Sequence, residues 1–370
     1  AEEFGNRIGV TRQTINNLEN GRVKLSKTQY IAMRSVLDEE MEKYLGCMEL
    51  EQSIIIANSA LVSCCHEPGK NDPPHVGWSD SIEDTVESFL FHRNRIISEL
   101  RQKKGGCFGC QAVKERFWEK KKNIKSLNIG VSYPCQLSCI YCTWPCNAKY
   151  NRSSYGVERI NDANKVDIAE LIHVLEKKGV FPDESLVGIA SGEITLANRK
   201  DEIFEAIGNH PAGVLTNGIV YDDKLANLIS RNDGSYINVS LDSGTPGTYK
   251  KVKGLDVFDR VVGNICRYKE KGAAILLKYI VLDENNNRDN IDGFIDVVKK
   301  IEPNEVILSY DFGKGQAGIK KTILEGTVDI AVRLDNIGTN YSFVEAFGEQ
   351  NLVTIRSDME RITSENNDNK

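Results

Sequence analysis

The sequence Cys135-Gln-Leu-Ser-Cys139-Ile-Tyr-Cys142 directly follows a strand-like run at 127–133. Three thiolates at this CxxxCxxC spacing can bind three irons of a [4Fe–4S] cluster and leave the fourth iron without a protein ligand. A zinc site is the alternative, because zinc takes four ligands and Cys146 would supply the fourth. Either interpretation places a metal at the carboxyl end of a strand, where barrel-type folds build their active sites.

Strand-like and helical segments alternate along the chain after residue 123. The strand-like runs are 127–133, 186–191, 213–216, 236–241, 274–282 and 305–310. Helical periods cover 166–179, 201–208, 222–230, 257–271 and 289–300. Strands that alternate with helices predict an α/β fold with a parallel sheet, either open or closed into a barrel.

The composition excludes several classes of protein. With 370 residues, 40% hydrophobic and 27% charged, the chain is neither wholly disordered nor collagen-like. The net charge of −6 means that any nucleic-acid surface must be local. The longest apolar run, 273–282, contains Lys278 and is too short to span a membrane. Ten cysteines in CxxC-like spacings, with no leader segment, favour metal binding in the cytoplasm.

The cysteine triplet, with an aromatic Tyr141 before its last member, resembles the signature of radical S-adenosylmethionine (radical SAM) enzymes. Further motifs of that family follow in order at successive strand ends: Ser191-Gly192-Glu193, Leu215-Thr216-Asn217-Gly218 and Val239-Ser240-Leu241-Asp242-Ser243-Gly244. The first is similar to the family's GGE motif, with a serine in place of its first glycine. The resemblance covers residues 123–312 and implies a partial (βα)6 barrel of the TIM type.

The resemblance also implies a chemistry. A [4Fe–4S] cluster held by Cys135, Cys139 and Cys142 would bind S-adenosylmethionine through its amino and carboxylate groups. Reduction would cleave the cofactor, and the resulting 5′-deoxyadenosyl radical would abstract a substrate hydrogen. The family implies an electron donor such as flavodoxin or ferredoxin, and a small-molecule or peptide substrate. The segment 240–249 is similar to members that modify peptides or sugars.

The same resemblance assigns residues to the cofactor. The expected contacts are Tyr141, Ser191, Gly192, Glu193, Asn217, Ser240 and Asp242. The carboxylate of Glu193 suits the cofactor's cationic amino group through a charge-assisted hydrogen bond. Two of these residues have a structural alternative, since Asn217 could cap a turn and Asp242 could cap the following helix.

A second group of cysteines precedes the barrel. Its members are Cys47, Cys64 or Cys65, Cys107 and Cys110, of which we choose Cys65 over its neighbour. The order of elements is one cysteine, a hairpin at 53–62, a helix at 81–104 and then a CxxC. This order resembles the auxiliary-cluster (SPASM or twitch) module of radical enzymes, although such modules normally follow the barrel. The alternatives are a zinc site that includes His66 and buried free thiols.

Residues 4–21 resemble a Cro/repressor-type helix-turn-helix, expected to be all-α and N-terminally truncated. Thr11 would cap the recognition helix, while Arg12, Gln13, Asn16 and Asn17 would face a DNA major groove. Six Lys or Arg against one acid between residues 5 and 34 fit phosphate contacts. A helical protein–protein module is the alternative interpretation.

Four domains are therefore predicted. They are a helix-turn-helix at 1–45, a small α+β Cys-rich module at 46–122, a radical SAM partial barrel at 123–330, and a partly disordered extension at 331–370. The leading hypothesis is a cytoplasmic radical SAM enzyme with one [4Fe–4S] cluster, S-adenosylmethionine, and a second cluster or zinc. The other hypotheses are a DNA-binding transcriptional regulator with an iron–sulfur sensor domain and a zinc-stapled binding protein.

Overall fold

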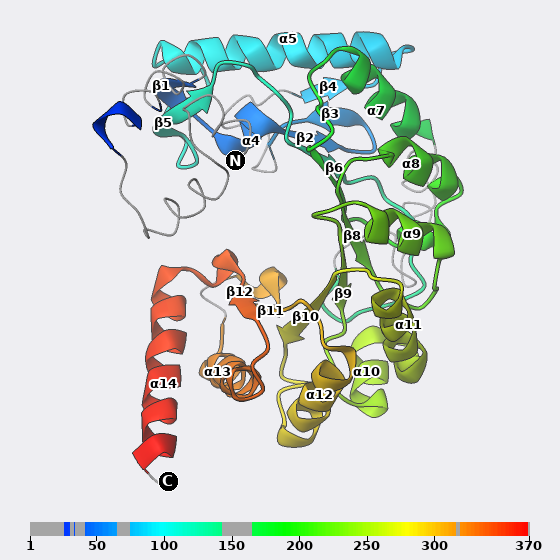
Figure 1. Ribbon diagram of the computed structural model, residues 1–370, viewed down its shortest axis with the longest axis vertical. Coiled ribbons are helices and arrows are strands. Elements are labelled where there is room, and N and C mark those ends of the chain that lie inside the picture. Colours follow the sequence, from blue (N-terminus) through cyan, green and yellow to red (C-terminus); the bar gives the residue numbers. More distant parts are fainter. Residues whose placement is uncertain are drawn as a thin grey trace. The chain divides into compact units, whose positions relative to one another are not determined.

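A computed structural model describes residues 26–29, 33, 41–64, 75–142, 165–315 and 319–368 (Figure 1). The predicted helix-turn-helix, with Thr11, Arg12, Gln13, Asn16 and Asn17, lies outside the described residues, as do Cys65, His66 and Cys146. The chain divides into two compact units. The first comprises Ala1–Ile54, Val62–Val76 and Glu87–Ile124, and the second comprises Ile55–Leu61, Gly77–Val86 and Lys125–Lys370.

The first unit is built on a two-stranded antiparallel sheet. Strand β1 (Met41–Gly46) pairs with β5 (Lys114–Glu119), and the short helix α4 (Met48–Gln52) follows β1. The second half of the long helix α5 (Ile82–Arg101) supplies most of the apolar partners. The shared hydrophobic cluster consists of Tyr44, Cys47, Leu50, Ile96, Ile97, Leu100 and Trp118. Packing between the ribbon and α5 therefore provides the core of this unit.

The large sheet contains ten strands in the order β12-β11-β10-β9-β8-β7-β6-β2-β3-β4. From β6 to β12 each strand pairs in parallel with its neighbour. Their bounds are β6 Ser126–Ile129, β7 Leu186–Ile189, β8 Ala212–Thr216, β9 Tyr236–Ser240, β10 Ile275–Val281, β11 Glu305–Tyr310 and β12 Tyr341–Phe343. The remaining strands are β2 Ser53–Ile56, β3 Ala60–Val62 and β4 His75–Gly77. All six predicted strands are thus present, in the predicted parallel arrangement.

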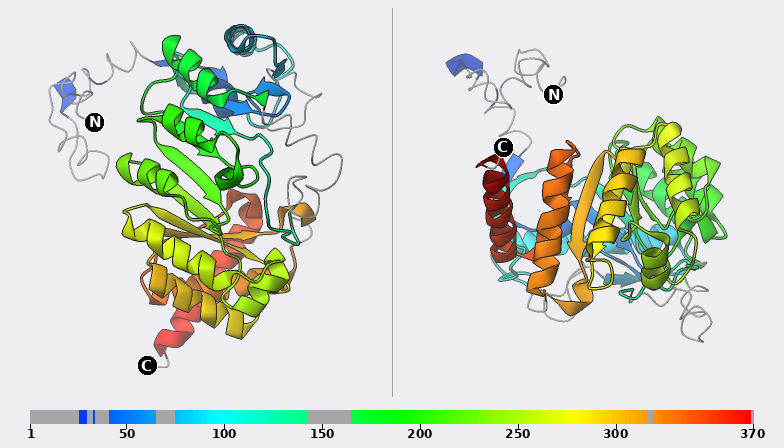
Figure 2. Two further views of the ribbon diagram at one scale, coloured as in Figure 1. Left: turned by 90° about the vertical axis from the view of Figure 1, so that its right-hand side faces the viewer. Right: turned by 90° about the horizontal axis from the view of Figure 1, so that it is seen from below.

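Helices follow the parallel strands, and Figures 1 and 2 show α7, α8, α9, α11 and α12 on one side of the curved sheet. The helices are α7 Ile168–Lys177, α8 Lys200–Ile207, α9 Asp223–Arg231, α10 Pro246–Lys253, α11 Phe258–Glu270, α12 Arg288–Ile301, α13 Lys321–Asn336 and α14 Glu349–Asp368. Short 3-10 turns occupy Ile194–Leu196, Phe312–Lys314 and Glu345–Phe347. The five predicted helices are confirmed, whereas α10, α13 and α14 were not predicted.

The C-terminal region is more regular than its composition predicts. We expected partial disorder at 331–370, yet α14 continues to Asp368. Ile355 of this helix is fully buried and the helix packs against α13, so its apolar residues anchor a largely polar segment. No helix in the described ranges is both long and apolar enough to cross a membrane.

The two faces of the parallel strands have different chemistry. Residues such as Val187, Ile237 and Leu277 are fully buried, and they alternate with half-buried polar residues such as Asn238 and Lys278. Side chains alternate between the faces of a strand, so the apolar set meets the helices and the polar set lies on the other, inner face. The sheet therefore presents its chemistry-bearing side chains on the face that the helices leave open.

A glycine contact fixes the loop after β9 against α12. A Cβ on Gly244 would lie 2.0 Å from the carbonyl oxygen of Asn290 and 2.1 Å from the nitrogen of Phe294. Replacing Gly244 with alanine must push two backbones apart, and we expect a loss of about 3 kcal/mol, the upper end for overpacking. Equilibrium urea denaturation measures the change.

Gly263 on α11 provides the matched control. A Cβ there meets nothing within 4 Å, so Gly263→Ala should leave stability unchanged or raise it by up to about 1 kcal/mol through helix propensity. Equal effects of the two substitutions would show that the loop yields and would contradict the predicted contact.

Candidate functional site

The three cysteines of the predicted cluster motif face one cavity in the second unit. The cavity measures about 530 Å³ and lies at the carboxyl ends of the parallel strands. Cys135, Cys139 and Cys142 line it, and all three are half-buried. The loop that carries them is held by α10, because Ser138 N donates to Lys253 O (3.1 Å) and Ile140 N donates to Val252 O (3.0 Å). The site is therefore built from the loop after β6 and the end of α10.

Burial controls the protonation of these thiols. It raises the pKa of Cys135 to about 12 and also raises the pKa of Cys139, whose thiolate the positive charge of Lys253 favours. The side-chain nitrogen of Asn217 lies 3.6 Å from Cys135 Sγ and is placed to donate to it. Bound metal deprotonates cysteine thiols, so occupancy would replace the neutral thiols of Cys135 and Cys139 by thiolates.

In the conformation described, no three His, Cys, Asp or Glu side chains of the described ranges are placed to hold a metal ion together. The cysteines nevertheless fit a cluster in kind and in position. They come from one loop and face the same cavity, beside Gly192, where a backbone without a side chain borders the space.

Glu193 is fully buried and its carboxylate is already engaged. One oxygen accepts from the hydroxyls of Thr195 (2.8 Å) and Thr216 (2.9 Å), and the other accepts from the backbone N–H of Asn217 (2.6 Å). Burial raises the pKa of Glu193, while these hydrogen bonds lower it. We expected the carboxylate to receive a cofactor amino group, but here it ties the ends of β7 and β8 together.

A buried charge network lies beneath the cysteine loop. Asp242 Oδ2 accepts from Lys253 Nζ (2.5 Å) and from Tyr141 Oη (2.5 Å), and Asp242 Oδ1 accepts from Ile280 N (2.7 Å). The side chains of Asp242 and Lys253 are 0% and 2% exposed. Burial lowers the pKa of Lys253, but the charge and hydrogen bond of Asp242, together with the charges of Cys139 and Cys135, raise it overall. The network joins the cysteine loop, β9, β10 and α10.

Asp242 does not cap the following helix, which was its structural alternative. The cap of α10 is Thr245, whose side chain accepts from Thr248 N. Asp242 instead adopts a left-handed backbone conformation (φ 53°) that turns its carboxylate to Lys253 and Tyr141. Asn217 does cap a turn, since its Oδ1 accepts from Ile219 N (3.0 Å), and it also lines the cavity.

The expected cofactor residues divide into two sets. Tyr141, Gly192, Asn217 and Ser240 line the cavity, whereas Ser191, Glu193 and Asp242 are buried beside it. The sequence motifs did not point to four further lining residues, Asn238, Lys253, Lys278 and Phe312. Strand alternation relative to Ser240 could have found Asn238, but only the folded chain returns Lys253 to the loop.

Gly192 is required by both its conformation and its surroundings. Its φ is +67°, and a Cβ would lie 2.1 Å from the carbonyl oxygen of Tyr133. Gly179 has a similar φ of +65° but meets nothing within 4 Å, so it isolates the conformational cost. Gly179→Ala should cost about 1 to 2 kcal/mol, and Gly192→Ala should cost about 1 to 3 kcal/mol more. Thermal and urea denaturation of both variants compare the two, and equal losses would contradict the contact at Tyr133.

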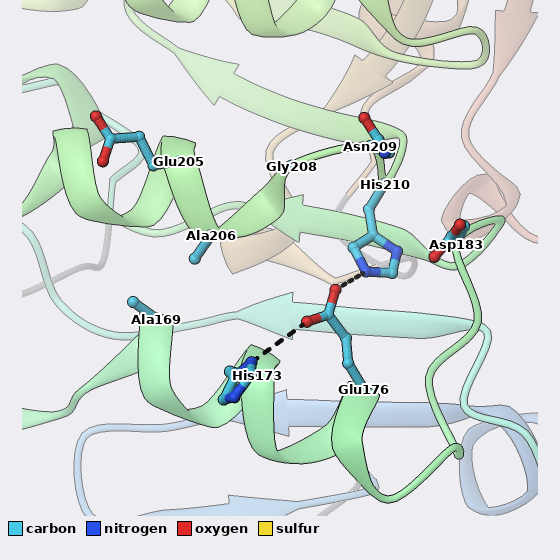
Figure 3. A pocket seen from close by; sticks show the side chains of 9 residues that line it. All are labelled: Ala169, His173, Glu176, Asp183, Glu205, Ala206, Gly208, Asn209 and His210. Atoms are coloured by element: carbon cyan, nitrogen blue, oxygen red, sulfur yellow. Dashed lines mark hydrogen bonds and ion pairs between the residues drawn. The ribbon is translucent and has the colours of Figure 1, made fainter.

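A second pocket, of about 350 Å³, lies beside α7 and α8 (Figure 3). In this pocket Glu176 Oε1 lies 3.1 Å from His210 Nε2, at hydrogen-bond distance. The other carboxylate oxygen, Glu176 Oε2, lies 3.9 Å from His173 Nδ1. The ring of His210 also packs on Phe181 at 4.4 Å between centroids. Because His210 precedes β8, this pocket is at the amino ends of the strands, where barrel folds place stabilising rather than catalytic residues.

The first unit brings part of the second cysteine group together. Cys47 directly follows β1, and the loop with Cys107 and Cys110 precedes β5, so the β1–β5 ladder holds the two segments side by side. Cys107 packs on the hydrophobic cluster that contains Cys47. Burial raises the pKa of Cys47, whereas hydrogen bonds from the backbone of Leu50 and Glu49 lower it. This arrangement leaves the zinc, iron–sulfur and free-thiol interpretations open.

Comparison with known proteins identifies the fold family of the second unit. The sequence model of the Radical SAM superfamily matches residues 129–297. A probable GTP 3′,8-cyclase of Saccharolobus solfataricus is 27% identical over 205 residues, which cover 54% of this chain and 61% of that protein. A protein named GTPase Obg from Brachyspira hyodysenteriae is 26% identical over 244 residues, which cover 62% of this chain and 33% of that protein. The chain thus spans less than two thirds of these relatives.

Among solved structures, SuiB of Streptococcus suis bound to S-adenosylmethionine is similar, with 13% identity and a TM-score of 0.48 over 72% of this chain and 57% of that chain. The match at 129–297, the parallel α/β sheet and the cysteine triplet at its carboxyl edge are those of a radical SAM superfamily enzyme over this part of the chain. This superfamily implies a [4Fe–4S] cluster and S-adenosylmethionine as cofactors.

Proposed function

We propose that this protein cleaves S-adenosylmethionine reductively and removes a hydrogen atom from a substrate bound in the same cavity. The observation that carries the proposal is the cavity shared by three cysteines and by the ends of the strands that follow them. When bound, the cluster and S-adenosylmethionine supply the one-electron chemistry. The protein's contribution is to hold, orient and shield the reacting groups.

Each part of the cavity wall has a distinct proposed role. Cys135, Cys139 and Cys142 would hold the cluster, and Asn217, beside Cys135, would direct a hydrogen bond at its sulfur. Gly192 leaves room for the cofactor at the end of β7, and Ser240 presents a hydroxyl from the end of β9. Such a hydroxyl suits the cofactor's polar groups.

Glu193, Asp242 and Lys253 take supporting roles in this proposal. Glu193 fixes Asn217 through its backbone N–H, and Lys253 with Asp242 fixes Tyr141 beneath the cysteine loop. Active sites require such neighbours because small displacements of reacting groups cost large factors in rate. The exposed rim of the cavity, with Phe312 at 52% exposure, is then left for the substrate.

Two substrate classes deserve testing. The names of the curated relatives favour a purine nucleoside triphosphate such as GTP. The sequence of residues 240–249, by its resemblance, favours a peptide or a sugar. Incubation of reconstituted protein with S-adenosylmethionine, reductant and either GTP or a peptide library, followed by mass spectrometry, separates the two by the mass change of the substrate.

We further propose that Cys47, Cys107 and Cys110, with Cys64 or Cys65, hold a second iron–sulfur cluster. Support comes from the β1–β5 ladder, which places Cys47 beside the Cys107–Cys110 loop. A four-cysteine cluster would serve electron transfer or substrate binding. A zinc ion bound by the same residues is the competing outcome.

One experiment tests both proposals. The chain is reconstituted anaerobically, desalted and assayed for iron, sulfide and zinc, and then for 5′-deoxyadenosine after reduction with S-adenosylmethionine present. About eight irons per chain with 5′-deoxyadenosine release supports both clusters. About four irons with one zinc retains the enzyme but overturns the second cluster. Absence of iron and of 5′-deoxyadenosine overturns the proposed function.

A further inference from the structure

Two lysines line the cysteine cavity, and they differ in how their charge is balanced. Lys253 is paired with the buried carboxylate of Asp242. Lys278, on β10, is half-buried, and within the described part of the chain it forms neither an ion pair nor a hydrogen bond. A partly buried ammonium without a counter-charge is unfavourable, so Lys278 is a position where a ligand can supply what the protein does not.

The surroundings of Lys278 show the cost of this arrangement. Burial lowers its pKa; the carboxylate of Asp242 acts in the opposite direction, and the positive charge of Lys253 adds to the lowering. The carboxylate that would balance Lys278 is therefore already committed to Lys253 at 2.5 Å. An added anion would remove the imbalance and restore the charged form of the lysine.

Polar and aromatic groups gather around this lysine on neighbouring strands. The β9–β10 register places Lys278 opposite Ser240, with Asn238 two residues earlier on the same face. The side-chain oxygen of Asn238 is buried and has no hydrogen-bond partner among the described residues, so it can accept from an N–H or O–H of a ligand whose anionic group lies at Lys278. The ring of Phe312 lies 5.4 Å from Lys278 Nζ and is 52% exposed. A cation, an amide and an aromatic surface thus meet on the β9–β11 side of the cavity.

This group is distinct from the cysteine side of the cavity. The charges that act on Lys253 include those of Cys139 and Cys135, whereas those that act on Lys278 are the charges of Asp242 and Lys253. Lys278 instead faces Phe312, in the turn after β11. Because Lys278 lies opposite Ser240, a molecule bound at Lys278 and Phe312 would lie directly next to the cofactor.

We infer that Lys278 binds an anionic group of the substrate, a carboxylate or a phosphate, with Asn238 and Phe312 completing the subsite. The assignment of that anion to the substrate rests on the proposed function above. Lysine is a common ligand of both oxyanions, because its ammonium offers three donors and a full charge. Substrates of this enzyme are therefore predicted to carry a negative charge near an apolar or planar group.

The test uses the reconstituted 370-residue chain and two probes, inorganic pyrophosphate and succinate. Dissociation constants of each probe and of S-adenosylmethionine are measured by anaerobic equilibrium dialysis without reductant. The variants are Lys278→Met, Lys278→Arg and, as control, Lys251→Met, an exposed lysine of α10 that does not line the cavity. Melting temperatures verify that each variant is folded.

We expect one probe to bind the wild-type protein and Lys251→Met, and to bind Lys278→Met about tenfold or more weakly. Lys278→Arg should retain most of the affinity, and the dissociation constant of S-adenosylmethionine should change less than about twofold. Preference for pyrophosphate or for succinate then distinguishes a phosphate from a carboxylate.

Two results would overturn the inference. In one, neither probe discriminates wild type from Lys278→Met. In the other, Lys278→Met loses affinity for S-adenosylmethionine in parallel, which would assign the lysine to the cofactor's own carboxylate. Probe binding needs no reduction, so it is measured independently of catalysis. If the wild-type protein binds the probe but releases no 5′-deoxyadenosine, the anion subsite stands and only the proposed function is overturned.

Discussion

Alanine in place of Cys139 is expected to reduce 5′-deoxyadenosine release to the level measured without enzyme. The substitution removes one of three thiols that face the cavity, and a [4Fe–4S] cluster held by two cysteines is not expected to survive desalting. Iron content should fall by about four atoms per chain, and the visible absorbance of the cluster should fall with it. Chemical iron analysis and chromatography of the reaction products provide the measurements.

Cys266 supplies the matched control for this result. It lies on α11, outside the cavity lining, so Cys266→Ala removes a thiol without removing a proposed ligand. Iron content and product release should then match those of the wild-type protein. Normal 5′-deoxyadenosine release by Cys139→Ala would contradict the assignment of the cluster to this loop.

Substitution of Lys253 with methionine should have the largest effect on stability. Asp242 is fully buried, and its pairing with Lys253 is the main compensation for its charge. Breaking such a pair by removing one partner leaves a buried charge unbalanced and costs about 3 to 5 kcal/mol. Equilibrium urea denaturation should show a transition at correspondingly lower denaturant concentration.

Removal of both charges tests whether the effect comes from the pair. The double variant Asp242→Asn with Lys253→Met should recover part of the loss, because no uncompensated charge remains. Lys250→Met is the control, since Lys250 is 64% exposed and its ion pair with Asp256 should contribute about 1 kcal/mol or less. Additive losses in the double variant would contradict coupling between Asp242 and Lys253.

The sequence predicted the parallel sheet well for a physical reason. Runs such as 186–191 and 236–241 are bounded by turn residues and separated by amphipathic helical periods, and this alternation is a local signal. Helix α10 was missed because it is only eight residues long and carries three lysines in its last turn. Helix α14 was missed because its sequence is largely polar, with few apolar residues such as the buried Ile355.

The cysteine motif was likewise readable, since ligand type and spacing are properties of the chain. Cys135, Cys139 and Cys142 meet one cavity because they lie on one short loop. The second cysteine group is harder to predict from the sequence, because its members come from distant segments. Whether they lie close together depends on how β1 pairs with β5. The DNA-binding prediction for Thr11 to Asn17 stays a prediction, as these residues lie outside the described part of the chain.

Local patterns in the sequence predicted the resemblance to the radical SAM superfamily, the strand order along the chain and the loop that carries the cysteines. The distribution of charge around that loop became visible only in the folded chain. In the folded chain Asp242 forms an ion pair with Lys253, and Glu193 accepts hydrogen bonds from Thr216 and Asn217. Lys278 has no acidic partner among the described residues. The physical reason is that charge balance depends on distances of a few ångströms between residues far apart in sequence, and local patterns carry no record of such distances.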